Sequence, residues 1–424
     1  MFFLNLLRRL IPKLLLGNIA FFAAIALSFA DSSSIVEHHD PIEIDATLSL
    51  AKVVDLTLEK HPDAAWLQAL EAEATAIARR GDSWIAGAAQ AGLRYQEATG
   101  GTLHYIDGTV QVPLWNPGQR DAEQRTAKLA ESSALSQAEA VKLRVAGLVR
   151  GALWDMALAN LNYEQVKAEL AITDQLLAKV QRRVELGDLP RADLLLAQSE
   201  SLQKRSVLTL AEAELMHARK RYTSITQMTK IPGVYQEKLV GLSEIQQNHP
   251  ALAALNGQIE RKQAELNAIK LVGSGQTNVA VGINSDQFSN DPRSNRTASF
   301  NIGVTVPFGG AAHLEPQVAA VNVELNKLVA EREQLSRDLE QAHHEAEHNL
   351  EVNRAELVIA DELQQVAEEH LKITHSSFSV GEIDLMDLLK IQSRTQQAVL
   401  NAKQRGIMLQ RDIALYNQAV GVMP

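Results

Sequence analysis

Residues 344–348 read His-Glu-Ala-Glu-His and therefore carry the spacing H-E-x-x-H. On a helix, this spacing places two imidazoles on one face, where they can hold zinc while the glutamate serves as the general base of a metalloprotease. The neighbouring residues argue against that chemistry. Glu347 puts a charge between Glu345 and His348, where longer zinc motifs carry uncharged residues. A third ligand from Glu368 or Glu369 would lie about 30 Å further along a straight helix.

No other set of residues supplies catalytic chemistry. The chain has no cysteine, which excludes disulfides, thiolate metal sites and thiol catalysis. It also has no glycine-rich phosphate-binding loop. We therefore predict that the protein is not an enzyme and holds no cofactor. His344 and His348, with His343 beside them, are weak candidates for binding a metal ion, and a solvated polar helix face is the alternative.

The first 30 residues have the pattern of a signal peptide. Arg8, Arg9 and Lys13 accompany an apolar stretch from Leu14 to Leu27, and Ser28-Phe29-Ala30 supplies the small residues of a cleavage site. A single membrane anchor is the alternative, but the stretch is short for a span. We predict that residues 1–30 are removed and that the mature protein is exported.

The remaining composition restricts the partners. Removing three basic residues with the signal peptide leaves 38 (41 less 3) against 51 acidic ones, a net charge of −13. No long basic run is present, so nucleic acid is not an expected partner. No later apolar run reaches about 18 residues, so no helical membrane span is expected.

Proline positions indicate very long helices. Residues 118–189 and 317–423 contain no proline, and proline is the residue that interrupts helix interiors. We expect long helices over 118–186 and 316–380, the first about 100 Å long at 1.5 Å per residue. Shorter return helices are expected over 190–230 and 383–420.

The second long helix carries the apolar spacing of a coiled coil. Its apolar residues alternate at three and four positions, with Arg332 as an interruption. The residues of this seam are Leu325, Leu328, Leu335, Leu339, Ala342 and Ala346.

The chain also repeats itself. Five residues or dipeptides of the first half recur in the second half: His61-Pro62 as His249-Pro250, Val112-Pro113 as Val306-Pro307, Gly187 as Gly381, Asp193 as Asp387, and Tyr222 as Tyr416. The last four pairs share an offset of 194 residues, which indicates an internal duplication. We expect a first repeat over 31–240 and a second over 241–424, each made of a helix, a β-hairpin, a long helix and a return helix.

Each repeat has two strand-like segments, in hairpins expected over 84–114 and 277–308. Apolar and polar residues alternate strictly in all four segments. The apolar set is Ile85, Ala89, Ala91, Leu93, Tyr95, Ile106, Val110, Val112, Leu114, Val279, Val281, Ile283, Phe300, Ile302, Val304, Val306 and Phe308. The polar set is Gln90, Arg94, Gln96, Asp107, Thr109, Gln111, Asn278, Asn284, Asp286, Ser299, Asn301 and Thr305. Such strands suit a membrane barrel with lipid on one side and water on the other, and a half-buried soluble sheet would look similar.

Strands that cross a membrane must close into a barrel, because open edges cannot face lipid. The smallest membrane barrels have about eight strands. Four strands per chain therefore require at least two chains, and three chains would supply twelve strands.

The repeat pattern, the Val-Pro strand ends and two helix-tip motifs resemble the outer-membrane efflux channel family typified by TolC. The tip motifs are Arg183-Val-Glu-Leu-Gly187-Asp-Leu-Pro-Arg-Ala-Asp193-Leu-Leu and Phe378-Ser-Val-Gly381-Glu-Ile-Asp-Leu-Met-Asp387-Leu-Leu. The resemblance covers the mature chain and implies a homotrimer in the outer membrane of a Gram-negative bacterium. The expected fold is mainly α with membrane β: long coiled-coil helices form an α-barrel tunnel through the periplasm, and each chain adds four strands to a shared twelve-stranded β-barrel.

The tip motifs also have a physical reading. Gly187 and Gly381 can end the long helices in a left-handed cap, and Pro190 can begin a return helix. By the resemblance, the residues that dock a periplasmic adaptor are Gly187, Asp188, Leu189, Gly381, Glu382 and Ile383; ordinary tight turns are the alternative.

The resemblance further implies that Asp193 and Asp387 belong to a periplasmic gate. A first-turn acid favoured by the helix dipole is the alternative for both. Lys390 departs from the family pattern, because some members carry a second aspartate there.

The expected function is a passive conduit from periplasm to exterior in a tripartite efflux system. The implied partners are a periplasmic adaptor (membrane fusion protein), an inner-membrane pump of RND type and outer-membrane lipids. Chain length, the lack of a lipid-anchor cysteine and the His-Pro helix starts favour the heavy-metal branch, which exports metal cations, or other small toxic compounds as cargo. A type I secretion channel uses the same scaffold. A periplasmic coiled-coil adaptor or structural protein is the alternative from another class.

Overall fold

The computed structural model describes residues 42–288 and 296–424. The expected signal peptide lies outside these residues. In chain order the elements are β1 (Glu43–Asp45), α1 (Leu50–Lys60), α2 (Asp63–Asp82), β2 (Gln90–Glu97), β3 (His104–Leu114), α3 (Gln119–Glu185), α4 (Arg191–Thr226), β4 (Lys230–Pro232), α5 (Pro250–Val272), β5 (Thr277–Gln287), β6 (Arg296–Thr305), α6 (Ala311–Ser379) and α7 (Leu385–Ala419).

The fold is mainly helical, and α3 and α6 are its longest elements. They contain 67 and 69 residues, whereas helices of globular proteins average about 11–12. Most of their stability must come from packing along the neighbouring helices, because isolated helices are marginal in water.

Two helix boundaries differ from the expectation by more than two residues. The second long helix was expected to begin at Pro316, but α6 begins at Ala311 and includes this proline. Pro316 lies only six residues into the helix, so it removes one hydrogen bond close to an end. The return helix expected to reach residue 230 ends at Thr226, because Gln227 adopts a left-handed conformation and Lys230 joins β4.

The strand starts and ends also need correction. The first hairpin was expected to begin at Trp84, but β2 begins at Gln90. The second was expected to extend to Phe308, but β6 ends at Thr305. Prolines explain both limits, since Pro113 and Pro307 have no amide hydrogen to donate to a neighbouring strand.

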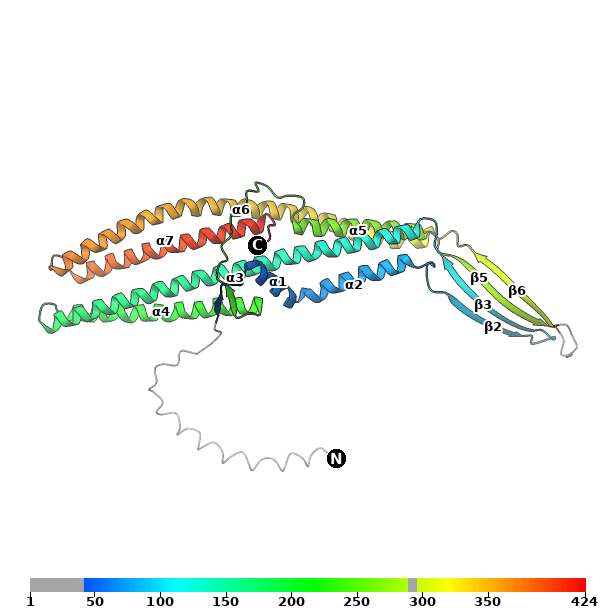
Figure 1. Cartoon of the computed structure of the whole chain (residues 1–424), viewed down its shortest axis with the longest axis horizontal. Coiled ribbons are helices and arrows are strands. Elements are labelled where there is room, and N and C mark those ends of the chain that lie inside the picture. Colours follow the sequence, from blue (N-terminus) through cyan, green and yellow to red (C-terminus); the bar gives the residue numbers. More distant parts are fainter. Residues whose placement is uncertain (1–41, 289–295) are drawn as a thin grey trace, which may run out of the picture. The chain divides into compact units, whose positions relative to one another are not determined.

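Four strands form one antiparallel sheet in the order β2-β3-β5-β6 (Figure 1). The two hairpins meet where β3 pairs with β5, with Val110 opposite Val281. In this chain β2 and β6 are therefore the edge strands, and each has one unpaired side. A separate two-stranded parallel sheet joins β1 to β4.

The helices pack side by side in two rows that share α3 and α6 (Figure 1). Toward the sheet, the order is α2, α3, α5 and α6; toward the helix tips, it is α4, α3, α7 and α6. A main hydrophobic core lies where α1 packs onto α3 and α4. Its buried residues are Leu50, Val53, Val54, Val141, Val145, Ala146, Val149, Ala152, Leu153, Met156, Leu215, Ala218 and Tyr222.

Candidate functional sites

The sheet separates apolar from polar side chains, as the alternation predicts. Ala91, Val110, Val281 and Ile302 are direct partners across the four strands and therefore share one face. The polar set shares the other face, where Arg94, Asp107, Asn284 and Ser299 are paired in the same way. The large apolar side chains are exposed from one end of their face to the other, which is costly for a surface in contact with water.

The polar face is the more enclosed of the two. Asp107 is only 8% exposed, and Asn301 Nδ2 lies 3.4 Å from both Asp107 Oδ1 and Asn284 Oδ1. Gly282 is required by this crowding, because a Cβ there would lie 2.7 Å from Asn301 Oδ1 and from Thr109 Cγ2. The sheet thus presents a hydrogen-bonded polar face and a bare apolar face.

Exposed aromatic side chains lie near both ends of the four strands. Trp84 and Phe308 lie in the connections between helices and strands and are largely exposed. Tyr95 and Phe288 are exposed near the far end of the strands, where the Tyr95 hydroxyl hydrogen-bonds Glu97 Oε2 at 2.9 Å. Aromatic residues at two levels around an apolar band are the arrangement that membrane barrels place at their lipid–water boundaries.

The ends of α3 and α6 have the same turn geometry. Gly187 and Gly381 have φ values of 83° and 84°, which confirms the left-handed caps expected from the sequence. Asp188 N–H donates to the Arg183 carbonyl at 2.9 Å, and Glu382 N–H donates to the Ser377 carbonyl at 3.0 Å. Both tips are therefore closed by the same backbone hydrogen bonds, and a residue with a β-carbon would be strained in place of either glycine.

The two tips pack against each other through a shared hydrophobic cluster. Its buried members are Leu176, Val180, Ala197, Leu385 and Leu388, drawn from α3, α4 and α7. Phe378 of α6 packs on this cluster, and the Arg183 guanidinium lies 5.4 Å from the Phe378 ring centroid. The two tips therefore lie at one level of the structure.

The predicted docking residues divide into two groups. Gly187, Asp188, Gly381 and Glu382 are exposed at the tips. Leu189 and Ile383 instead pack against the shared cluster, so their side chains support the turns from within. Sequence reasoning missed two apolar residues that immediately precede the glycines and are strongly exposed, Leu186 and Val380.

The predicted gate residues both lie in first helical turns. Asp193 belongs to the first turn of α4, and its N–H donates to the Pro190 carbonyl at 3.1 Å. Asp387 belongs to the first turn of α7, and its N–H donates to Asp384 Oδ1 at 2.8 Å. Acidic side chains at these positions favourably face the positive ends of the helix dipoles, whichever other role they have.

The H-E-x-x-H stretch does not form a common site. His344 and His348 are exposed on α6, whereas His343 is buried and its Nε2 lies 3.2 Å from the Tyr416 hydroxyl. Ala342 was expected in the helix seam but is exposed; His343 occupies that position, because the seam advances by four residues from Leu339. Over residues 42–288 and 296–424, no group of three or more histidine or carboxylate side chains is arranged to hold a metal ion.

A buried arginine, which sequence reasoning did not single out, connects three distant parts of the chain. The Arg150 side chain of α3 is 0% exposed and forms a bidentate pair with Glu237, at 2.8 and 2.7 Å. It also donates to Gln418 Oε1 at 2.5 Å and to the Val422 carbonyl at 3.0 Å. Arg150 thereby fastens the connection after β4 and the end of α7 to the middle of α3.

Two tyrosines fasten the same connection between the halves. The Tyr222 hydroxyl donates to the Lys230 carbonyl at 2.7 Å, and the Tyr416 hydroxyl donates to the Leu242 carbonyl. Asn417 adds a hydrogen bond from its Nδ2 to the Lys238 carbonyl at 2.9 Å. The connection is thus bound along its length rather than free.

In both repeated His-Pro pairs the imidazole accepts a backbone N–H two residues further on, and His249 is thereby the N-cap of α5. His61 Nδ1 accepts the Asp63 N–H at 3.3 Å, and His249 Nδ1 accepts the Ala251 N–H at 3.2 Å. An imidazole can accept in this way only while Nδ1 carries no proton. Burial lowers the pKa of His249, and the Ala419 carbonyl partly opposes this effect.

The melting temperature should fall as the pH is lowered from about 8 to about 5.5, and we expect this fall to be smaller in the variant His249→Asn. The pKa of His249 is lower in the folded chain than in the unfolded chain, so its contribution is present above about pH 6.5 and is lost as the pH falls below that value. Asparagine caps a helix without titrating in this range. Melting followed by circular dichroism tests this, with exposed His344→Asn as the control. An unchanged pH dependence in the His249 variant would contradict the assignment.

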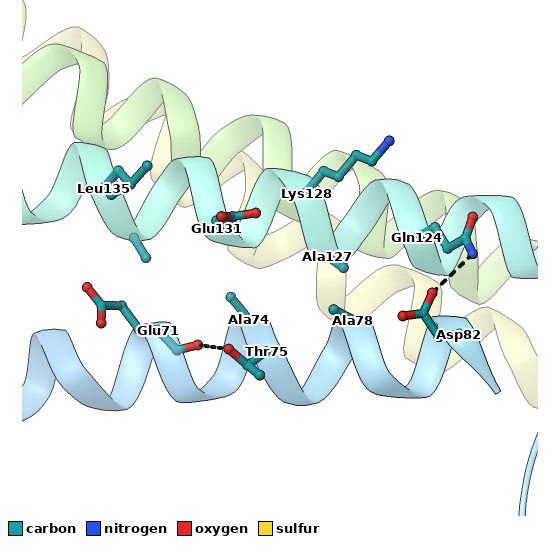
Figure 2. Close-up of a pocket in the computed structure, with 11 residues that line it drawn as sticks. Glu71, Ala74, Thr75, Ala78, Asp82, Gln124, Ala127, Lys128, Glu131 and Leu135 are labelled. Atoms are coloured by element: carbon teal, nitrogen blue, oxygen red, sulfur yellow. Dashed lines mark hydrogen bonds between the residues drawn. The ribbon is translucent and has the colours of Figure 1, made fainter.

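An open groove of about 650 Å³ runs between α2 and α3 (Figure 2). Ala74 and Ala78 of α2 face Ala127 of α3 across the groove, and Lys128 and Glu131 of α3 also line it. Its side chains provide no nucleophile paired with a base.

Among the helices that the structure describes, none has a stretch long and apolar enough to cross a membrane.

Comparisons with known proteins agree on one fold. No protein-family model and no curated protein matches the sequence. The structure is similar to that of CusC, described as forming a transmembrane channel, with a TM-score of 0.70 and 12% identity over 90% of this chain and 94% of that chain. It is also similar to the Campylobacter jejuni outer-membrane channel CmeC (TM-score 0.67, 13% identity, 88% and 85% covered) and the Vibrio cholerae outer-membrane protein VceC (TM-score 0.67, 16% identity, 88% and 97% covered). The chain therefore has the fold of these outer-membrane channels along most of its length.

Proposed function

We propose that this protein is the outer-membrane channel of a tripartite efflux system and acts as a passive conduit. The observation that carries the proposal is the four-stranded sheet, which has an exposed apolar face, a hydrogen-bonded polar face and two unpaired edges. The fold shared with solved outer-membrane channels supports it. In this proposal the apolar face contacts lipid, and the polar face lines the water-filled passage.

The unpaired strands require more than one copy. Backbone groups on the free sides of β2 and β6 need partners within a lipid bilayer, and another copy of the same sheet supplies them. We propose a homotrimer with twelve strands, as the TolC-like resemblance implies. The two halves of each chain, related by the internal duplication, would then give six similar units around the axis.

The proposed partners lie at the opposite end from the sheet. The exposed tip residues Gly187, Asp188, Gly381 and Glu382 would meet a periplasmic adaptor, with Leu186 and Val380 as apolar contacts. An inner-membrane pump of RND type would supply the energy. Asp193 and Asp387 of each copy would form the periplasmic gate, where clustered carboxylates attract cations.

The proposed cargo is heavy-metal cations or other small toxic compounds. Support comes from the absence of cysteine and the His-Pro helix starts, which favour the heavy-metal branch. His344 and His348 are exposed on α6 and remain candidates for weak metal contact along the route.

Detergent extraction and planar-bilayer recording test the channel itself. We expect the full chain to be extracted from outer membranes only with detergent, as an oligomer that conducts ions across a lipid bilayer. A monomer that stays in solution without detergent and conducts no ions would contradict the proposed channel and favour a periplasmic adaptor or structural protein. Conductance together with export of an unfolded polypeptide would favour a type I secretion channel.

Gly381→Val should separate assembly from docking. At φ 84° a β-branched residue costs on the order of 1–3 kcal/mol, although nothing lies within 4 Å of the added Cβ. We expect normal oligomer in the outer membrane but greatly reduced cross-linking to the adaptor and reduced efflux.

Gly406→Val is the matched control, because Gly406 lies within α7, has open space around its Cβ and lacks a positive φ. It should preserve docking. Normal adaptor cross-linking by the Gly381 variant would show that the tip is only a turn.

A further inference from the structure

Two histidines form an exposed pair in the middle of α6. His344 and His348 are four positions apart, and both side chains are exposed. Four positions advance a helix by about 6 Å and bring the second residue nearly above the first, so the two imidazoles lie on one face. His343 does not join them, because it is buried and its Nε2 lies 3.2 Å from the Tyr416 hydroxyl. The pair is therefore formed by one helix within a single copy of the chain.

The equivalent positions of the first half are covered, whereas this pair is open. The sequence offset of 194 residues matches His344 to Arg150 of α3, and it matches His348 to Trp154. Both first-half residues are buried under the connection that follows β4, where the Tyr235 ring packs against Trp154 with ring centroids 4.9 Å apart. No described segment covers the two histidines in this way. Their ring nitrogens are thus accessible to a ligand from solvent.

The surroundings of the pair are acidic. Residues 338–353 contain no Lys or Arg, and their acidic residues are Asp338, Glu340, Glu345, Glu347 and Glu351. A stretch of one charge sign raises the local concentration of the opposite ion, here a cation. Within the described part of the chain neither imidazole of the pair has a hydrogen bond or an ion pair. The pair therefore offers two unengaged nitrogen ligands where cations gather.

The chemistry of imidazole determines which cation fits. Imidazole nitrogens suit divalent zinc, copper and nickel, whereas Mg²⁺ and Ca²⁺ prefer oxygen ligands. Among the described residues no third histidine or carboxylate is placed to complete a set with the pair, so the protein supplies two ligands and water supplies the others. Structural metal sites are closed by four protein ligands, and a site with open positions can exchange its ion. The pair thus fits a reversibly bound transition-metal ion.

We propose that His344 and His348 chelate one divalent transition-metal ion between their imidazole nitrogens, with water in the remaining coordination positions. The binding goes beyond the proposed channel and does not rest on it, because the site needs neither a membrane nor a second copy of the chain. Where the proposed cargo is a metal cation, this site gives it a defined point of contact on α6.

Titration of the untagged, detergent-extracted full chain with Ni²⁺ tests the site. We expect H344Q combined with H348Q to weaken the tightest Ni²⁺ binding by at least about tenfold, because loss of even an outer-shell partner of a metal ligand costs about 10–100-fold. An excess of Ca²⁺ should not displace the Ni²⁺, since Ca²⁺ takes oxygen ligands.

H370Q combined with H375Q is the matched control. It also removes two exposed histidines from α6, but their spacing of five positions places them on different sides of the helix. We expect the Ni²⁺ affinity of this variant to stay within about twofold of the unchanged chain. All four side chains are exposed, so both double variants should keep the same helical circular dichroism spectrum.

A spectroscopic measurement identifies the ligands themselves. One equivalent of Cu²⁺ should show electron paramagnetic resonance couplings to two imidazole nitrogens in the unchanged chain and to one in H348Q. Unchanged couplings in H348Q, equal loss of Ni²⁺ affinity in both double variants, or displacement of Ni²⁺ by Ca²⁺ would overturn the site.

The outcomes for the site and for the channel are separable. A conducting oligomer whose Ni²⁺ affinity does not depend on His344 and His348 would overturn the site and leave the channel standing. A non-conducting monomer that binds Ni²⁺ through the pair would overturn the proposed channel and support the site.

Discussion

Ile302→Arg is expected to keep most of the protein out of the outer membrane. Ile302 lies on the apolar face, opposite Val281, in the row of partners that crosses all four strands. An arginine near the bilayer midplane of a membrane barrel costs about 2–4 kcal/mol. In the proposed barrel, every copy would carry the same cost. The measurement is the amount of protein recovered in washed outer membranes relative to total protein in the cell.

Ser299→Arg is the matched control for this prediction. Ser299 lies on the same strand three residues earlier, but on the polar face, and it is exposed. Its arginine would project toward water in the passage, so we expect near-normal insertion with altered ion selectivity. Equal effects of the two substitutions would show that the assignment of lipid and water faces is wrong.

Arg150→Met is expected to have the largest effect on the helical region. The substitution leaves Glu237 without its bidentate partner in a site where the arginine side chain is fully buried. Removing one member of a buried ion pair typically costs about 3–5 kcal/mol. We expect a lower midpoint of denaturation by circular dichroism and faster protease cleavage within residues 233–249.

Two further variants test whether loss of the buried ion pair causes the destabilisation expected for Arg150→Met. Arg144→Met removes a more exposed pair with Asp63 from the same helix and should cost less than about 1 kcal/mol. Arg150→Met combined with Glu237→Leu removes both buried charges and should recover much of the lost stability. Failure of the double variant to recover would show that the hydrogen bonds to Gln418 and Val422 matter more than the ion pair.

The strand faces could be predicted because their signal is local. Alternation with period two is a property of consecutive residues, and a one-residue error would invert every face. The strand ends could not be predicted from alternation alone. Ile85 and Ala89 continue the pattern, but the register places Pro113 opposite Ala88, where proline cannot donate a hydrogen bond, so the ladder begins at Gln90.

The turns at the helix tips could also be predicted from the sequence, because a glycine after a long proline-free segment is typical of a left-handed helix cap. The packing of Leu189 and Ile383 was not, since it depends on bringing two tips from opposite halves of the chain into one cluster. Arg150 shows the same limit. A single charge within the apolar stretch from Val145 to Trp154 is the available signal, but its partners lie 87 and 268 residues away.

The connection held by Arg150 has a mechanical consequence. Near this level α4 has ended at Thr226 and α7 at Ala419, while α2 and α5 are only beginning, as the bonds from Arg144 to Asp63 and from Gln418 to Leu143 show. Only α3 and α6 are continuous across it. At this level α1, the hydrophobic core around it and the bound connection pack where the other helices are interrupted. We therefore expect cutting the connection within residues 233–249 to make the chain more flexible at this level, although all the helices and strands remain intact.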